Sequence, residues 1–155
     1  MYNKIAELVK AAEESGKPIS ELMLLQEMAK SHRTREDIWE QMRNNYHVMK
    51  AAVEKGLAGD GVFSPTGLTG GEAVKLRIYR QRGNTLSGDD LLIAVESAIA
   101  TNEVNASLGI ICATPTAGSS GTLPGVMFAI KDKLGLTEEQ MVQMLLLACS
   151  SAMNE

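Results

Sequence analysis

The sequence predicts an all-α protein of about six or seven helices, with two Gly-rich functional loops between them. Apolar residues recur at helical spacing along most of the chain, and residues that cap helices stand before several of these stretches. No segment shows the strict alternation of apolar and polar residues that predicts a half-buried strand. The apolar run at residues 110–112 is too short to build a sheet. With 155 residues, the chain is long enough for one domain with a buried core.

Seven stretches have the pattern of a helix. They span about residues 5–15, 19–30, 34–55, 72–82, 88–105, 124–133 and 137–155. Gly16 and Gly56 are expected to end the first and the third, because glycine readily adopts the left-handed conformation that follows many helices.

Capping residues mark the predicted starts of three of these helices. Thr34 with Asp37, and Thr137 with Gln140, have the spacing at which two side chains satisfy each other's backbone N–H groups. Ser87 precedes two aspartates whose charge favours a helix N-terminus.

Composition excludes several classes of protein. The net charge of −4 disfavours a general nucleic-acid-binding protein, which presents a basic face. The apolar runs are shorter than the roughly 18 residues of a membrane-spanning helix, and the acidic N-terminus is unlike a secretory signal. Two widely spaced cysteines do not predict a disulfide framework. We therefore expect a cytoplasmic, reducing location, with no nucleic acid and no membrane as partner.

The first long break, residues 56–71, contains hydroxyl residues that alternate with glycine ahead of a helix. Such a loop presents backbone N–H groups to an anion such as a carboxylate. The alternative is an ordinary helix entry in which Thr69 is the cap.

The second polar and Gly-rich stretch, residues 101–125, carries the other candidate groups. Asn102 and Asn105 share one helix face next to Glu103, where they either hold the polar groups of a substrate or form a solvated helix end. Cys112 is either a metal or cluster ligand or a small buried residue. Cys149 lies among apolar residues, which favours a place in the core.

Three motifs in order, SPTGLTGGEAVKL, ATNEVNASLG and ICATPTAGSSGTLPGV, strongly resemble the α subunit of the bacterial iron–sulfur-dependent L-serine dehydratases (L-serine ammonia-lyases) of the two-subunit form. The resemblance implies an enzyme that converts L-serine to pyruvate and ammonia, in amino-acid degradation and gluconeogenesis. It also implies a [4Fe–4S] cluster that acts as a Lewis acid on the substrate. A β subunit is the implied partner, and an oligomer is expected.

The resemblance assigns a role to each candidate residue. The substrate-binding residues it implies are Ser64, Thr66, Gly67, Thr69, Gly70, Asn102, Asn105, Thr116, Gly118, Ser119, Ser120 and Gly121, with Pro115 beside them. Cys112 is implied as a cluster ligand, and Glu103 is the candidate catalytic acid or base.

The α subunits of this family are about twice as long as this chain, so residues 1–155 correspond to the N-terminal part of the catalytic domain. Two cysteines do not supply a three-Cys cluster site. We therefore expect an incomplete catalytic subunit that needs a complementary C-terminal fragment. Two alternatives are a helical interaction module that has lost the chemistry, and a metal-free binder of a small carboxylate.

Overall fold

The computed structural model describes residue 2, residues 4–114, residue 116 and residues 118–151, and for residues 149–151 it describes the backbone alone. These residues form seven α-helices and no strand, which confirms the predicted all-α class. The chain divides into two compact units, one of residues 1–44 with 138–155 and one of residues 45–137. The long helix α3 (Arg35–Ala58) contributes its first part to unit 1 and its second part to unit 2.

Unit 1 contains α1 (Ile5–Ser15), α2 (Ile19–Ser31), the start of α3 and α7 (Glu138–Ser151). Helix α2 packs against α1 on one side and against α7 on the other. The first contact is built on Leu8, Leu22 and Met23, and a second cluster joins Leu24, Ile38 and Leu146. Leu8 and Leu22, which have the predicted helical spacing, thus lie in the core of this unit, whereas Ile5, from the same predicted pattern, is exposed.

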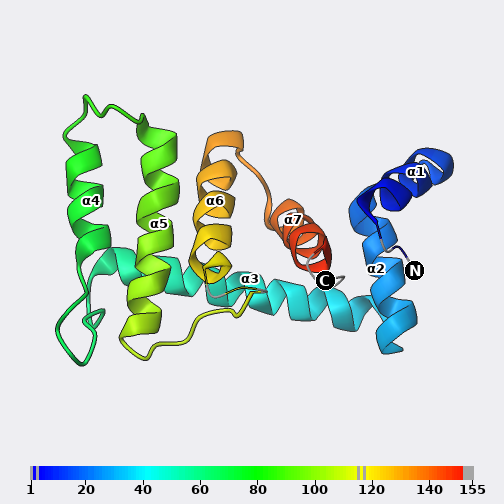
Figure 1. Ribbon diagram of the computed structural model, residues 1–155, viewed down its shortest axis with the longest axis horizontal. Coiled ribbons are helices and arrows are strands. Elements are labelled where there is room, and N and C mark those ends of the chain that lie inside the picture. Colours follow the sequence, from blue (N-terminus) through cyan, green and yellow to red (C-terminus); the bar gives the residue numbers. More distant parts are fainter. Residues whose placement is uncertain (1, 3, 115, 117, 152–155) are drawn as a thin grey trace. The chain divides into compact units, whose positions relative to one another are not determined.

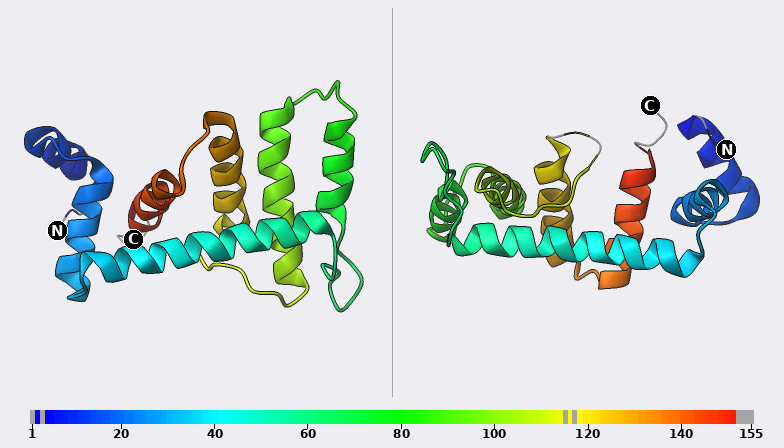
Figure 2. Two further views of the ribbon diagram at one scale, coloured as in Figure 1. Left: turned by 180° about the vertical axis from the view of Figure 1, so that it is seen from behind. Right: turned by 90° about the horizontal axis from the view of Figure 1, so that it is seen from below.

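Unit 2 contains the rest of α3, with α4 (Glu72–Gln81), α5 (Asp89–Ala106) and α6 (Ser119–Leu134). Helix α5 lies between α4 and α6, and the three helices stand in a row along α3 (Figures 1 and 2). Their core is formed by fully buried residues, among them Tyr46, Met49, Val62, Ala100, Val104 and Met127.

Small residues let the helices of unit 2 approach closely. A Cβ on Gly125 of α6 would lie 2.5 Å from the carbonyl oxygen of Ala94 and 2.9 Å from the Cβ of Ala98, both on α5. Gly56 of α3 is pressed in the same way against Ala100 of α5. Because a methyl group has no room at either position, the separation of these helices depends on glycine.

Several predicted boundaries are confirmed. Thr34 and Asp37 form the predicted reciprocal cap, with N–H to side-chain oxygen distances of 3.1 Å in both directions. Gly16 follows α1 in the left-handed conformation, at φ 66°. Helix α7 begins at Glu138, directly after the predicted cap Thr137.

Four local predictions are wrong. Helix α6 begins at Ser119 rather than at about residue 124, and Pro124 lies inside it. Gly56 does not end α3, because its bare backbone fits against Ala100 and the helix continues to Ala58. The N-cap of α5 is Gly88 rather than Ser87. The N-cap of α4 is Gly71 rather than Thr69, whose hydroxyl turns instead to a carboxylate oxygen of Glu72 at 3.4 Å.

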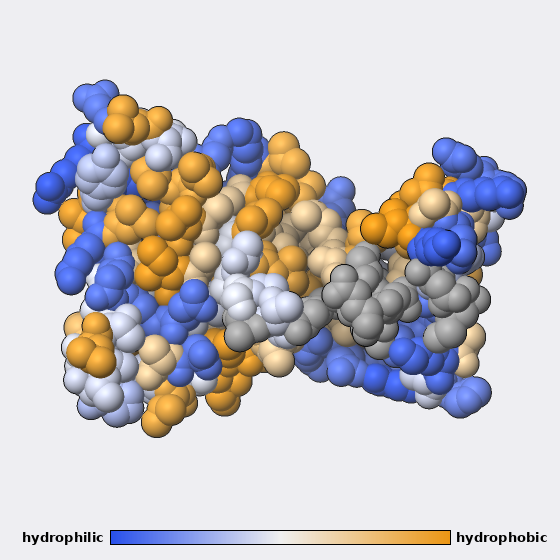
Figure 3. Space-filling model, in the orientation of Figure 1, coloured by the Kyte–Doolittle hydropathy of each residue, from blue (hydrophilic) through white to orange (hydrophobic). Residues whose placement is uncertain are grey.

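The surface of unit 2 carries many apolar side chains. Figure 3 shows apolar surface over α4, α5 and α6, and the exposed large residues of these helices include Ile78, Leu91, Val95 and Val126. Within the described part of the chain, no helix is both long and apolar enough to cross a membrane.

Candidate functional site

The two Gly-rich loops lie at the same end of unit 2. The first, residues 59–71, leads into the N-terminus of α4, and the second, residues 107–118, joins the C-terminus of α5 to the N-terminus of α6. In Figure 1 both loops are at the lower end of these three helices. Two helix N-termini, each with the partial positive charge of a helix start, therefore lie at the same end of the unit.

The first loop is folded on its own hydroxyl groups. The N–H of Ser64 donates to the carbonyl of Thr69 at 2.9 Å, and the N–H of Gly67 donates to the carbonyl of Ser64 at 2.9 Å. The Ser64 hydroxyl lies 3.2 Å from that of Thr66 and accepts the N–H of Thr69 at 3.3 Å. Gly67 has φ 69°, which glycine adopts without strain. The loop thus presents Ser64 and Thr66 together at a tight turn.

Glu103 of α5 holds the start of α4. Its Oε1 accepts the backbone N–H groups of Glu72 and, at 3.3 Å, Ala73. Glu72 in turn accepts the N–H of Gly70 at 2.7 Å through Oε2. A carboxylate at a helix N-terminus is favourable, because it meets unpaired N–H groups. Glu103 therefore fixes both the helix and the end of the preceding loop.

The two carboxyl groups have opposite acidities. Burial raises the pKa of Glu103 to about 6, and a hydrogen bond with the Glu72 carboxyl adds to the rise. The pKa of Glu72 is lowered to about 2, first by its hydrogen bond with Glu103 and then by the N–H of Gly70. Glu103 is only 2% exposed, and its Oε2 accepts no hydrogen bond from the described residues. Among the described titratable residues near the loops, Glu103 and Glu72 have the pKa values that depart most from the ordinary value.

The second loop ends in a cluster of hydroxyl groups. Thr114 Oγ1 lies 2.6 Å from Ser119 Oγ and 3.1 Å from Ser120 Oγ. The N–H of Thr116 donates to Ser119 Oγ at 3.0 Å, and the N–H of Ser119 donates to Thr116 Oγ1 at 3.2 Å. This reciprocal cap fixes the first turn of α6, where Ser120 is buried.

Asn102 connects α5 to the same turn of α6. A Cβ on Gly121 would lie 2.7 Å from Asn102 Oδ1 and 2.9 Å from the carbonyl oxygen of Ala98, so the asparagine side chain packs directly on this glycine. Asn105 lies three residues further along α5 and is exposed. Asn102 and Glu103 are adjacent in the chain, so α5 places one side chain on each loop.

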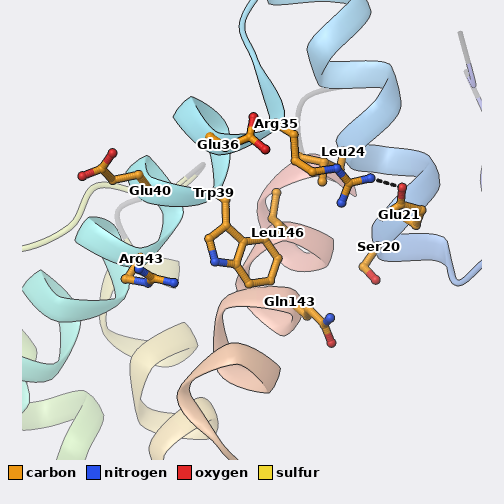
Figure 4. A pocket seen from close by; sticks show the side chains of 10 residues that line it. All are labelled: Ser20, Glu21, Leu24, Arg35, Glu36, Trp39, Glu40, Arg43, Gln143 and Leu146. Carbon is orange, nitrogen blue, oxygen red and sulfur yellow. Dashed lines mark hydrogen bonds and ion pairs between the residues drawn. The ribbon is translucent and has the colours of Figure 1, made fainter.

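The larger hollow of unit 1 contains none of the predicted residues. It measures about 630 Å³ and is lined by Trp39, Leu24 and Leu146, with charged side chains around them (Figure 4). Arg35 pairs with Glu21 at its edge. The residues that line this hollow belong to unit 1, whereas both loops belong to unit 2.

Comparison with known proteins decides the family. The family model described as serine dehydratase alpha chain matches residues 14–154. The chain belongs to the serine dehydratase alpha chain family.

Curated relatives agree with this assignment. The probable L-serine dehydratase alpha chain of Bacillus subtilis (strain 168) is 53% identical over 148 residues, which are 96% of this chain and 49% of that protein. The L-serine dehydratase alpha chain of Peptoniphilus asaccharolyticus is 36% identical over 133 residues, 86% of this chain and 45% of that protein. L-serine dehydratase 2 of Escherichia coli (strain K12) is 31% identical over 134 residues, 81% of this chain and 28% of that protein.

The chain spans about half the length, or less, of these curated relatives. No solved structure matches it.

Cys112 is the one predicted metal ligand, and it lies in the loop between α5 and α6. Its thiol is half-buried and lies 3.6 Å from the carbonyl oxygen of Ala113. Within the described ranges, no three His, Cys, Asp or Glu residues come together as a metal site. Pro115 and the side chain of Cys149 lie outside the described residues. The described residues of the chain therefore do not fit a complete iron–sulfur cluster.

Sequence reasoning missed two residues of the site. Thr114 is at the centre of the hydroxyl cluster, and its place two residues before Thr116 was a signal that it belongs to the same loop. Glu72 was expected only as the start of a helix. Its contact with Glu103, 31 residues away in sequence, depends on tertiary packing and has no local signal.

Proposed function

We propose that this chain supplies part of the catalytic subunit of an L-serine ammonia-lyase, which converts L-serine to pyruvate and ammonia. The observation that carries the proposal is that two hydroxyl-rich loops lie at the same end of unit 2, before α4 and α6, in a serine dehydratase family chain. The names of the relatives support the substrate.

The first loop is proposed to bind the substrate carboxylate. Ser64, Thr66 and Thr69 provide hydroxyl donors. Gly67 allows a close approach, because a Cβ there would meet nothing within 4 Å, whereas Gly70 packs against Phe63 and shapes the loop.

The second loop and the adjoining face of α5 are proposed to form the opposite side of the substrate pocket. Hydroxyl and amide groups there suit the amino and hydroxyl groups of serine. The residues assigned to this side are Asn102, Asn105, Thr116, Gly118, Ser119, Ser120 and Gly121.

Glu103 is the proposed acceptor of the α-proton. Its raised pKa of about 6 leaves it ionised at neutral pH yet basic enough to take a proton. In this step the Cα–H bond breaks, its electron pair forms the Cα=Cβ bond, and the Cβ–O bond breaks. The hydroxyl leaves as water with a proton from the solvent, and Glu103 afterwards returns the α-proton to the solvent. The resulting aminoacrylate tautomerises to the imine, which takes up water and releases ammonia to give pyruvate.

A [4Fe–4S] cluster is part of the proposal, with Cys112 as one of its ligands. When bound, such a cluster supplies a Lewis acid for the substrate hydroxyl. Since the described residues offer one cysteine side chain, the other ligands must come from outside them, in a complementary part of the subunit.

The proposed substrate site is tested by NMR titration of the chain with L-serine. We expect shifts at Gly67, Gly70 and Gly121, with weaker or no shifts from D-serine and from L-alanine, which lacks the hydroxyl. Equal shifts from all three compounds, or shifts confined to unit 1, would contradict the site.

A second candidate function is that of an interaction module that pairs with a β subunit or with a complementary fragment. It is favoured by large apolar side chains exposed on the loops themselves, with Leu68 88%, Leu108 83% and Ile110 81% exposed. Purification of the chain with such a partner, in a complex that contains no iron and forms no pyruvate, would support this candidate over the enzyme.

A further inference from the structure

Two acidic side chains meet at the start of α4 in an arrangement that ionised carboxylates do not tolerate. Glu103 Oε2 is buried and receives no hydrogen bond from the described residues while the side chain is ionised. The neighbouring group is the Glu72 carboxyl, which is also an acceptor. Two acceptors cannot bond to each other, and an unpaired oxygen in the interior is costly.

A single proton removes this conflict. If Glu103 carries it, Oε2 becomes a donor and the Glu72 carboxylate becomes its acceptor. The other oxygen of Glu103 still accepts the N–H groups of Glu72 and Ala73. The buried Oε2 of Glu103 then has a partner.

We propose that Glu72 is a positioning residue, and that a proton shared between Glu103 and Glu72 latches the loop of residues 64–70 onto α5. The link from the pair to the loop is the N–H of Gly70, which donates to Glu72 Oε2 at 2.7 Å. The Thr69 hydroxyl points to the same oxygen at 3.4 Å. When Glu103 ionises, its charge repels Glu72, and this exposed side chain swings away and releases Gly70.

Few other charged side chains act on the carboxyl groups of Glu103 and Glu72. Among the described residues, the charged side chain that acts on Glu103 is Glu72, whereas Glu72 is acted on by Glu103 and by Lys75 of the same helix. Helices α3 and α6 and the loop after α5 bring no charged group that acts on either carboxyl within the described ranges. Lys75 favours the ionised form of Glu72 and so keeps the proton on Glu103.

Through the latch, the position of the loop of residues 64–70 depends on whether Glu103 carries a proton. This consequence rests on the proposed function: if Glu103 takes the α-proton of the substrate, that transfer restores the hydrogen bond with Glu72 and closes the loop over the site. The latch itself is a property of the chain without substrate. It is therefore testable even if the proposed activity is wrong.

The test follows backbone amides by NMR hydrogen exchange between pH 5 and 7.5, corrected for the intrinsic rate at each pH. We expect the protection of Gly70 to fall about tenfold across the pKa of Glu103, because each pH unit changes the protonation ratio tenfold. The amide of Ala73 should keep its protection, since Glu103 Oε1 accepts it in both states.

Three variants separate the latch from general loosening. In Glu103→Gln the amide donates to Glu72 at every pH, so Gly70 should stay protected without a step. Glu72→Gln, at an exposed side chain, should also remove the fall in Gly70 protection with pH, because the glutamine amide donates to ionised Glu103. Glu54→Gln, at the exposed helical pair with Lys50, should leave the step unchanged.

Two results would overturn the latch. One is a wild-type chain in which the protection of Gly70 and Ala73 changes together or not at all. The other is a step at Gly70 that persists in Glu72→Gln. Neither readout requires L-serine, so a failure of the latch is distinct from a failure of the proposed reaction.

Discussion

Gly125→Ala tests the close contact between α5 and α6 on which the site is built. The added methyl carbon would lie 2.5 Å from the carbonyl oxygen of Ala94 and 2.9 Å from the Cβ of Ala98. Both neighbours are fixed parts of α5, so no side chain can rotate away. The helices have to separate by about half an ångström or more to reach ordinary van der Waals distance.

The expected cost follows from two opposing effects. Overpacking of this kind destabilises by about 1–3 kcal/mol. Replacing glycine by alanine inside a helix recovers up to about 1 kcal/mol. We therefore expect Gly125→Ala to lower the free energy of unfolding by about 1–2 kcal/mol.

Gly118→Ala is the matched control. A Cβ at Gly118 meets nothing within 4 Å, and the residue already has helical dihedral angles, with φ −66° and ψ −36°. Its change in stability should stay within about 0.5 kcal/mol of the wild type. Urea unfolding followed by circular dichroism measures both variants, and the reasoning is refuted if Gly125→Ala is as stable as Gly118→Ala.

Three further predictions concern charge and substrate. Arg80 donates two hydrogen bonds of 2.9 and 3.0 Å to the nearly buried Glu96, so Arg80→Ala should lower the free energy of unfolding in urea by about 3–5 kcal/mol. Arg43→Ala, at the exposed pair with Glu138, should lower it by less than about 1 kcal/mol, and equal losses would contradict the reasoning. The folded pKa of Glu103, about 6, lies above its ordinary value of 4.5, so its contribution of up to about 2 kcal/mol is present below pH 4.5 and lost as the pH rises through 6. Glu103→Gln should abolish that loss, and an unchanged pH profile of unfolding would count against the assignment. Calorimetry should detect weaker binding of L-serine by the variant Thr66→Val than by the wild type, whereas equal affinity would remove Thr66 from the site.

The sequence was sufficient where local chemistry decides the structure. The pair Thr34 and Asp37 predicted a helix start because its atoms are three residues apart and bond to each other. Gly16 predicted a helix end because a left-handed residue completes the turn before it.

Prediction failed where a distant segment decides the structure. Gly56 has the local signature of a helix end, yet α3 continues because Ala100 of α5 needs the space that a side chain would fill. The roles of Glu72 and Thr114 could not be read from spacing either, since their partners are set by how α5 meets α4 and α6. The resemblance assigned the candidate site to the two loops, but did not indicate the carboxyl pair that joins one of them to α5.

The most direct test of the central claim is an anaerobic assay for pyruvate from L-serine. This chain is reconstituted with iron and sulfide, alone and together with the part of the Bacillus subtilis relative that it does not cover. The account predicts pyruvate from the mixture, and none from either part alone, because the described residues do not form a complete cluster site. Turnover by this chain alone, or a folded mixture that binds iron and L-serine yet forms no pyruvate, would contradict it.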